Sequence, residues 1–267
     1  MSPEACHDVN VEIGGKAIRL VTTDPDFQAS LAARYRAFLN PSAAAGLELS
    51  IQLGDHPPSL PDGDVRVSFQ DGQWTVTRGD FRSVWCPESG KGVVEQTANL
   101  YSIDTVLRII HTLLLVREGG FLLHASSAIR NHRAFVFSGL SGAGKTTISR
   151  SAPADAQLLT DEISYIRRDS RGYTACGTPF FGELGVAGEN VGAPVAALYF
   201  LAKGNENRID PIPPAEAARL LLRNILFFSD DRELVDLLFQ AGCDFLQAVA
   251  ARRLSFLPDE RVWELMQ

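Results

Sequence analysis

Residues 123–161 read LHASSAIRNHRAFVFSGLSGAGKTTISRSAPADAQLLTD, and the rest of the chain is organised around this stretch. Its centre, GLSGAGKT at residues 139–146, fits the phosphate-binding pattern G-x4-G-K-[ST] at every fixed position. The apolar residues 134–137 before it predict a strand, and a helix can begin at Thr146. Strand, glycine-rich loop and helix follow in the order that such a loop requires, which indicates a nucleotide phosphate site.

The residue types of this loop suit phosphate binding. Glycines permit positive φ and close backbone approach, so consecutive N–H groups can turn toward phosphates at a helix N-terminus. Lys145 would reach the β and γ phosphates, and the Thr146 hydroxyl would ligate Mg²⁺. The candidate nucleotide-binding residues are Gly139, Ser141, Gly142, Ala143, Gly144, Lys145, Thr146 and Thr147.

An acidic pair, Asp161-Glu162, follows Lys145 by 16 residues and comes directly after a short apolar segment. A short helix and a strand fill this interval, which places the carboxylates at the sheet edge where α/β proteins hold ligands. A carboxylate there can ligate a metal or accept a proton from a hydroxyl, whereas the alternatives are a solvated turn or a helix cap. His124 ends an apolar run near the same edge, and the residues alone leave open a core histidine or a site residue.

Composition narrows the class of protein. The 267 residues suit two domains or one large one, and a 45% hydrophobic content supports a substantial core. A net charge of −7 gives no broad field for nucleic acid or anionic lipid, so no nucleic-acid partner is expected. The cysteines show no paired spacing, and the N-terminus does not resemble a signal peptide. We therefore expect a cytoplasmic protein without a membrane segment.

Residues 1–100 predict a smaller β-rich N-terminal domain without a catalytic signature. Period-2 apolar patterns separated by Gly, Pro, Asp and Asn indicate strands, and one helix is expected at residues 26–39. The aromatic residues Trp74, Phe81 and Trp85 are interpreted as packing residues. The expected strands are residues 9–13, 17–21, 47–53, 65–69, 74–77, 81–85 and 93–96.

Residues 101–267 predict an α/β (α+β) domain with the loop at its centre. A helix at residues 103–116 opens it, and strands at 121–126 and 134–137 are joined by a polar turn. Arg219 and Arg223 share one helical face and either border the phosphates or are solvated. The later segments are expected as a strand at 196–202, an extended connection at 209–214, helices at 214–228, 233–240 and 259–266, and an edge strand at 245–250.

Taken together, these motifs resemble the bacterial HPr kinase/phosphorylase family, whose P-loop domain is similar to that of phosphoenolpyruvate carboxykinase. The resemblance is carried by Leu123-His124-Ala125, the loop at 139–146 and Asp161-Glu162, where the family usually has Asp-Asp. It implies a mixed-sheet P-loop kinase domain, with Asp161 as the catalytic base and a metal contact and with His124 assisting. It also implies that Glu183, in the segment at 182–185, contacts the metal or the substrate.

The resemblance implies an ATP- and Mg²⁺-dependent kinase that phosphorylates a serine-type hydroxyl of a peptide, small protein or small molecule. Residues 177–180, GTPF, are similar to a segment of diverged members that phosphorylate lasso-peptide precursors. Two alternatives stay open: an ATP-binding module or chaperone for a peptide, and a phosphatase or phosphorylase running the chemistry in reverse. Hexamers occur in the family, so a homo-oligomer is one expectation.

Overall fold

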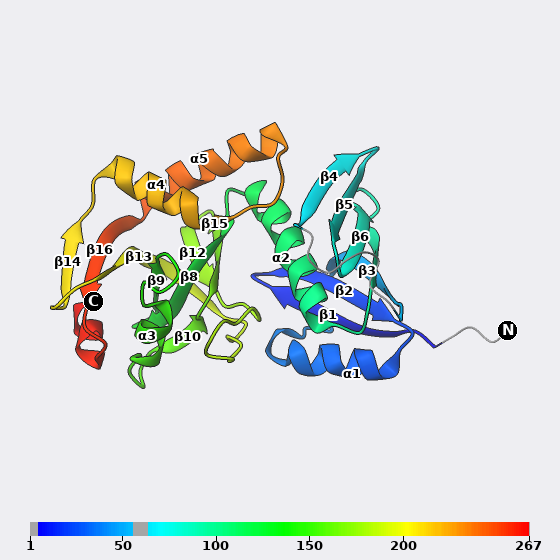
Figure 1. Ribbon diagram of the computed structural model, residues 1–267, viewed down its shortest axis with the longest axis horizontal. Coiled ribbons are helices and arrows are strands. Elements are labelled where there is room, and N and C mark those ends of the chain that lie inside the picture. The colour runs from blue at the N-terminus through cyan, green and yellow to red at the C-terminus, as the bar shows by residue number, and fades with distance from the viewer. Residues whose placement is uncertain (1–4, 56–63, 267) are drawn as a thin grey trace. The chain divides into compact units, whose positions relative to one another are not determined.

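The computed structural model describes residues 5–55 and 64–266, and the chain divides into two units (Figure 1). The first unit comprises Met1–His111 and Phe228–Arg232, and the second comprises Thr112–Phe227 and Glu233–Gln267. The division lies inside helix α2 (Leu100–Val116), whereas the sequence pattern places the domain boundary at residue 100. Each unit contains its own mixed sheet, so the chain has a mixed α/β architecture.

The sheet of the first unit has the strand order β1-β2-β3-β7-β6-β5-β4. The pairs β2–β3 and β3–β7 are parallel, and the other neighbouring pairs are antiparallel. Each strand expected from the period-2 pattern is present, because alternate apolar side chains bury one face of the sheet. The strands are β1 (His7–Ile13), β2 (Lys16–Thr22), β3 (Ala45–Leu53), β4 (Arg66–Gln70), β5 (Gln73–Arg78), β6 (Phe81–Cys86) and β7 (Lys91–Gln96).

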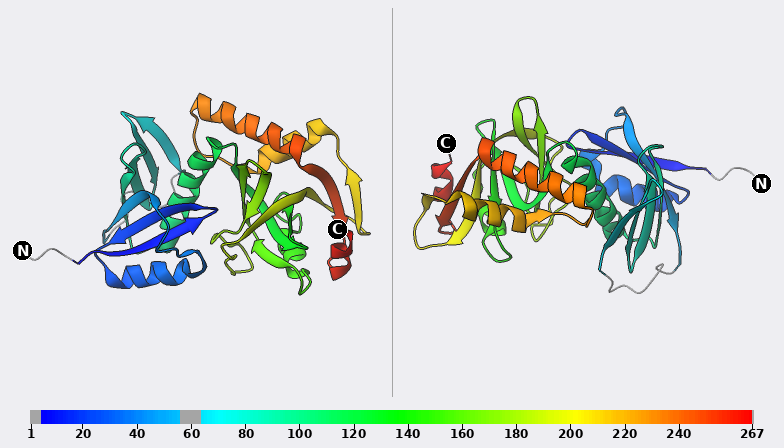
Figure 2. Two further views of the ribbon diagram at one scale, coloured as in Figure 1. Left: turned by 180° about the vertical axis from the view of Figure 1, so that it is seen from behind. Right: turned by 90° about the horizontal axis from the view of Figure 1, so that it is seen from above.

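Helix α1 (Pro25–Arg34) packs against β1 and β2 (Figure 2). The Asp24 carboxylate accepts a hydrogen bond from the Phe27 amide at 2.8 Å and so caps the helix. The α-helix expected to residue 39 ends earlier, and a 3-10 turn, η1 (Arg36–Phe38), follows it. Trp74, Phe81 and Trp85 are buried, which confirms that they are packing residues.

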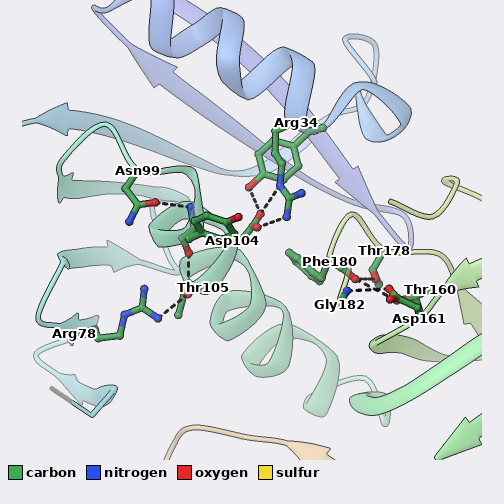
Figure 3. A network of polar contacts seen from close by, with 12 residues as sticks. Arg34, Arg78, Asn99, Asp104, Thr105, Thr160, Asp161, Thr178, Phe180 and Gly182 are labelled. Atoms are coloured by element: carbon green, nitrogen blue, oxygen red, sulfur yellow. Dashed lines mark hydrogen bonds and ion pairs between the residues drawn. The ribbon is translucent and has the colours of Figure 1, made fainter. Parts of the chain in front are cut away.

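A buried polar cluster ties α1 to α2 within the first unit (Figure 3). The Asp104 carboxylate pairs with the Arg34 guanidinium and accepts a hydrogen bond from the Tyr35 hydroxyl at 2.7 Å. Burial raises the pKa of Tyr35 well above its ordinary value, and the Asp104 charge raises it further. The cluster therefore satisfies a carboxylate that would be costly to bury alone.

The second unit has a sheet in which β8 is the central strand. Its first half pairs with β11 and β15, and its second half pairs with β9 and β10. Pairings from β8 through β11, β12, β13 and β9 return to β8 and form a closed circuit. The strands are β8 (Phe121–Arg130), β9 (Arg133–Ser138), β10 (Gln157–Thr160), β11 (Ile163–Asp169), β12 (Gly172–Cys176), β13 (Gly192–Lys203), β14 (Arg208–Pro211), β15 (Ile225–Leu226) and β16 (Ala250–Phe256).

Helices cover both faces of this sheet. On one face, α4 (Pro214–Asn224) and α5 (Arg232–Ala248) lie side by side, as the views in Figures 1 and 2 agree. On the other face, α3 (Lys145–Arg150) and the 3-10 helix η2 (Glu260–Leu265) pack with Phe137. The Trp263 indole N–H donates to the Ile148 carbonyl at 3.3 Å, which holds η2 against α3.

Several expected elements of the C-terminal region are wrong. Residues 245–248 continue α5, and the strand that follows, β16, lies between β13 and β14 and is therefore no edge strand. The helix expected at 214–228 ends at Asn224, because residues 225–226 pair with β8 as β15. Residues 259–266 form 3-10 turns instead of an α-helix. Strands β11 and β12 had no sequence-based expectation.

Two structural findings concern the expected compartment. None of the helices in the described ranges 5–55 and 64–266 has both the length and the apolar character needed to cross a bilayer. All four cysteines fall within these ranges and are unpaired thiols.

Candidate functional site

The glycine-rich loop connects β9 to α3 in the second unit. Gly142 and Gly144 have φ of 74° and 108°, which disfavours any residue with a side chain. The Ala143 amide donates to the Leu140 carbonyl at 3.0 Å and closes a turn inside the loop. A Cβ at residue 144 would lie 2.8 Å from the Phe256 ring, so packing against β16 also disfavours a side chain at this residue.

Lys145 begins α3 and turns its side chain back over the loop. Its ammonium donates to the carbonyls of Gly139 at 2.9 Å and Leu140 at 3.4 Å. Burial lowers the pKa of Lys145, and the charges of Glu162 and Glu183 act in the opposite direction. The ammonium is thus held at the loop by weak carbonyl bonds that a phosphate oxygen could replace.

Asp161 follows β10 and has a nearly buried side chain, with 3% of the residue exposed. Its Oδ1 accepts a hydrogen bond from the Gly182 amide and its Oδ2 from the Leu184 amide, both at 2.9 Å. Figure 3 shows the Asp161 side chain beside Gly182. The carboxylate therefore binds the backbone on both sides of Glu183.

Glu183 brings a second carboxylate to the loop. The Thr146 hydroxyl donates to Glu183 Oε2 at 3.2 Å, across a sequence separation of 37 residues. A hydroxyl and a carboxylate this close supply two hard oxygen ligands, which is the chemistry that Mg²⁺ prefers. Mg²⁺ commonly takes one or two protein oxygens and completes its shell with water and phosphate oxygens, so these residues fit the ion.

A larger all-protein metal cage is absent from the described part of the chain. No group of three or more His, Cys, Asp or Glu side chains there could hold a metal ion. Thr146 and Glu183 supply two adjacent donors that fit Mg²⁺, and each Asp161 oxygen accepts one backbone amide and keeps a further lone pair for a metal ion or its waters.

His124 and Glu162 complete the polar lining. His124 is in β8, directly opposite Ile163 in the pairing with β11. Burial lowers its pKa, and the Lys145 charge lowers it further, so the imidazole is neutral at pH 7. Glu162 Oε2 lies against Gly182, where an added Cβ would come within 3.0 Å of it.

One cavity of about 270 Å³ collects these groups at the loop. It is lined by His124, Ser141, Gly142, Gly144, Lys145, Thr146, Thr147, Asp161, Glu162, Gly182 and Glu183. Every residue singled out from the sequence as a site residue lines it except Gly139 and Ala143. No residue pattern identifies the backbone amides of Gly182 and Leu184 in advance, because every residue type except proline supplies an amide N–H.

A second cavity, of about 360 Å³, also adjoins the loop and shares Ser141 and Gly142 with the first. Gly139 and Ala143 line it together with the apolar residues Phe200, Leu201 and Leu220. Outside the loop, the polar residues that line this cavity are Lys203 and Asn224. The exposed residues Arg219 and Arg223 line neither cavity.

A family model described as SynChlorMet cassette protein ScmC matches residues 84–267. The search of curated proteins finds no match to this chain.

Proposed function

The chain belongs to the ScmC family of SynChlorMet cassette proteins, and we propose that it is an ATP-dependent kinase acting on a serine-type hydroxyl. The acceptor class is a peptide, a small protein or a small molecule. The family name states no activity, so the proposal rests on the site. The observation that carries it is one cavity lined by a phosphate-binding loop, its lysine, an acidic pair and a third carboxylate.

The loop side of the cavity suits a triphosphate. Gly142 and Gly144 adopt backbone conformations that let successive amides face one point, and α3 begins at Lys145. The Lys145 ammonium, now bonded to loop carbonyls, would exchange them for β and γ phosphate oxygens. Such exchange replaces neutral acceptors by charged ones and so favours nucleotide binding.

Thr146 and Glu183 would hold Mg²⁺ on the same side of the cavity. Bound there, Mg²⁺ would neutralise charge on the transferred phosphoryl group. We place the γ phosphate beside this pair, and Asp161 and Glu162 line the same cavity.

The proposed reaction is an in-line displacement at the γ phosphorus. The acceptor oxygen forms a bond to phosphorus while the bond to the β–γ bridging oxygen breaks, and ADP leaves with that electron pair. The hydroxyl proton passes to a carboxylate of the acidic pair, which the sequence-based assignment places at Asp161. Positioning and charge neutralisation supply most of such catalysis, so few dedicated residues are required.

For the fold, we propose that the second unit is of the HPr kinase/phosphorylase type. Support comes from the succession of a histidine-bearing strand, the loop, the acidic pair after a short strand and a glutamate beside a glycine turn. Parallel pairing of β9 with β13 and of β13 with β16 behind the loop is compatible with a P-loop domain.

Transfer of label from ATP to serine tests the proposal directly. We expect labelled γ phosphate to appear on serine-containing peptides, detected by mass spectrometry, and to be absent from the same peptides with serine replaced by alanine. Lys145→Ala should reduce transfer at least 100-fold while circular dichroism stays unchanged, because the ammonium serves the phosphates. Lys91→Ala, which removes an exposed lysine of the first unit, is the matched control.

The alternatives give different results in the same assay. Binding of a fluorescent ATP analogue without any transfer would replace the kinase by an ATP-binding module. Phosphate-dependent loss of label from a phosphoserine peptide would instead indicate the reverse reaction.

A further inference from the structure

We propose that Asp161 is a positioning residue that holds the turn at residues 182–185 so that Glu183 faces the Thr146 hydroxyl. The inference deepens the proposed function, because it assigns a role at the same phosphate site. It gives Asp161 a structural role in addition to that of proton acceptor, which the resemblance to HPr kinase/phosphorylase implies.

The hydrogen bonds of the Asp161 carboxylate are the first argument. Its two oxygens accept from the amides of Gly182 and Leu184, which are the residues immediately before and after Glu183. Bonds from backbone amides to a buried carboxylate are charge-assisted and stronger than neutral ones. A carboxylate that bonds both neighbours fixes the backbone from which the Glu183 side chain extends.

Close packing of the turn on the acidic pair is the second argument. The Gly185 amide donates to the Gly182 carbonyl at 3.1 Å, and Gly185 has φ of 66°, so the turn is tight. A Cβ at residue 182 would come within 3.3 Å of Asp161 Oδ2. Glycine at this position therefore lets the turn approach the carboxylate.

The preceding segment is bound to the same part of the sheet (Figure 3). The Thr160 hydroxyl donates to the Phe180 carbonyl at 3.2 Å, and the Thr178 hydroxyl donates to the Ile163 carbonyl at 2.8 Å. These bonds hold residues 178–180 beside the connection from β10 to β11. Asp161 adds two further hydrogen bonds to this segment, and they lie on either side of Glu183.

The outcome of these attachments is the contact between Glu183 and Thr146. Thr146 is placed by the loop and α3, whereas Glu183 is placed by a turn 37 residues later. Their oxygens lie 3.2 Å apart, close to the spacing of about 3 Å between neighbouring ligands of an octahedral Mg²⁺ ion.

The test measures metal binding and does not require turnover. Mn²⁺ serves as the paramagnetic probe, and its affinity is measured by electron paramagnetic resonance with a non-hydrolysable ATP analogue. Supporting groups around metal ligands typically contribute a factor of roughly 10 to 100 in metal affinity. We expect Asp161→Asn and Glu183→Gln each to weaken Mn²⁺ binding by about tenfold or more, and the double variant to show less than the product of the two losses.

A second readout follows the turn itself. In Asp161→Asn, hydrogen exchange at the Gly182 and Leu184 amides should accelerate, because the amide side chain can accept from only one of the two. Asp169→Asn, which changes a carboxylate that accepts the Arg171 amide at 2.8 Å and lines neither cavity, is the matched control and should leave Mn²⁺ affinity within about twofold of the unmodified protein.

The proposal is overturned if Asp161→Asn keeps Mn²⁺ affinity and slow exchange at both amides while losing transfer, since that pattern belongs to a proton acceptor. Failure of the kinase proposal is a separate result. Absence of transfer in the unmodified protein, with the Mn²⁺ and exchange effects intact, would remove the transferase activity and leave the positioning role standing.

Discussion

His124 shows how the environment of one residue sets the chemistry that it can perform. The imidazole is half-buried in β8 and lines the cavity with Lys145. Because burial and then the Lys145 charge lower its pKa, it enters the site as a neutral hydrogen-bonding group. Any assistance from His124 at pH 7 is therefore orientation of a polar group, without a positive charge.

At this scale we predict that His124 titrates below pH 6.5, its ordinary value, when followed by NMR of the imidazole ring. Replacing Lys145 by methionine should raise the His124 pKa, because removal of a nearby positive charge favours the imidazolium. His124→Gln assigns the resonance, and Lys91→Met serves as the control for a lysine elsewhere. A His124 pKa at or above 6.5 in the unmodified protein would contradict the description of this site.

The loop at residues 139–146 requires glycine at particular positions. Gly144 combines φ of 108° with a position where a Cβ would press on the Phe256 ring of β16. Gly172 has a similar φ of 122° at the first residue of β12, and a Cβ added there would have no atom of a non-neighbouring residue within 4 Å. A side chain at residue 172 would therefore meet backbone strain alone, whereas a side chain at residue 144 would meet both strain and crowding.

We therefore predict that Gly144→Ala weakens binding of a fluorescent ATP analogue at least tenfold. Gly172→Ala carries a comparable backbone cost of roughly 1–2 kcal/mol but should leave nucleotide affinity unchanged. Adding Phe256→Leu to Gly144→Ala should restore part of the affinity, because the smaller side chain gives the Cβ room. Equal losses of affinity in the two glycine variants would show that general backbone strain, and not the geometry of the loop, lowers nucleotide affinity.

At the scale of the whole molecule, His111 links stability to pH. It lies in α2, is fully buried and has its pKa lowered to about 3 by burial and, to a lesser extent, by the Lys16 charge. In the unfolded chain the His111 imidazole has its ordinary pKa of 6.5 and binds a proton below that pH. The contribution of neutral His111 to the unfolding free energy is complete above pH 6.5 and is lost as the pH falls toward 3.

We predict that the unfolding free energy falls by on the order of 4 kcal/mol across this window on account of His111 alone. Urea titrations of a Trp263→Phe variant report the first unit, because the remaining tryptophans, Trp74 and Trp85, lie there with His111. His111→Gln in the same background should have a shallower dependence on pH, whatever its absolute stability. Identical slopes for the two proteins would count against a neutral buried histidine.

Local features of the sequence determined the β-rich first unit and the conformation of the glycine-rich loop. Alternating apolar residues and turn glycines act over a few neighbours, so the strands of the first unit lie close to where the pattern predicts them. The loop motif is equally local, since its glycine conformations and the start of α3 depend on adjacent residues. The acidic pair and His124 were identified as candidates for the same reason.

Tertiary structure alone decided how these parts meet. Residues 245–248 could form a strand by composition, but packing of Phe245 against Phe121 and Tyr173 keeps them in α5. The partners of Asp161 are backbone amides 21 and 23 residues away, and backbone amides carry no residue-specific signal. The sequence by itself thus determined the glycine-rich loop and identified the carboxylates that lie near it. Long-range packing decided that Asp161 bonds the turn and that Glu183 reaches Thr146, because such contacts depend on how distant segments fold together.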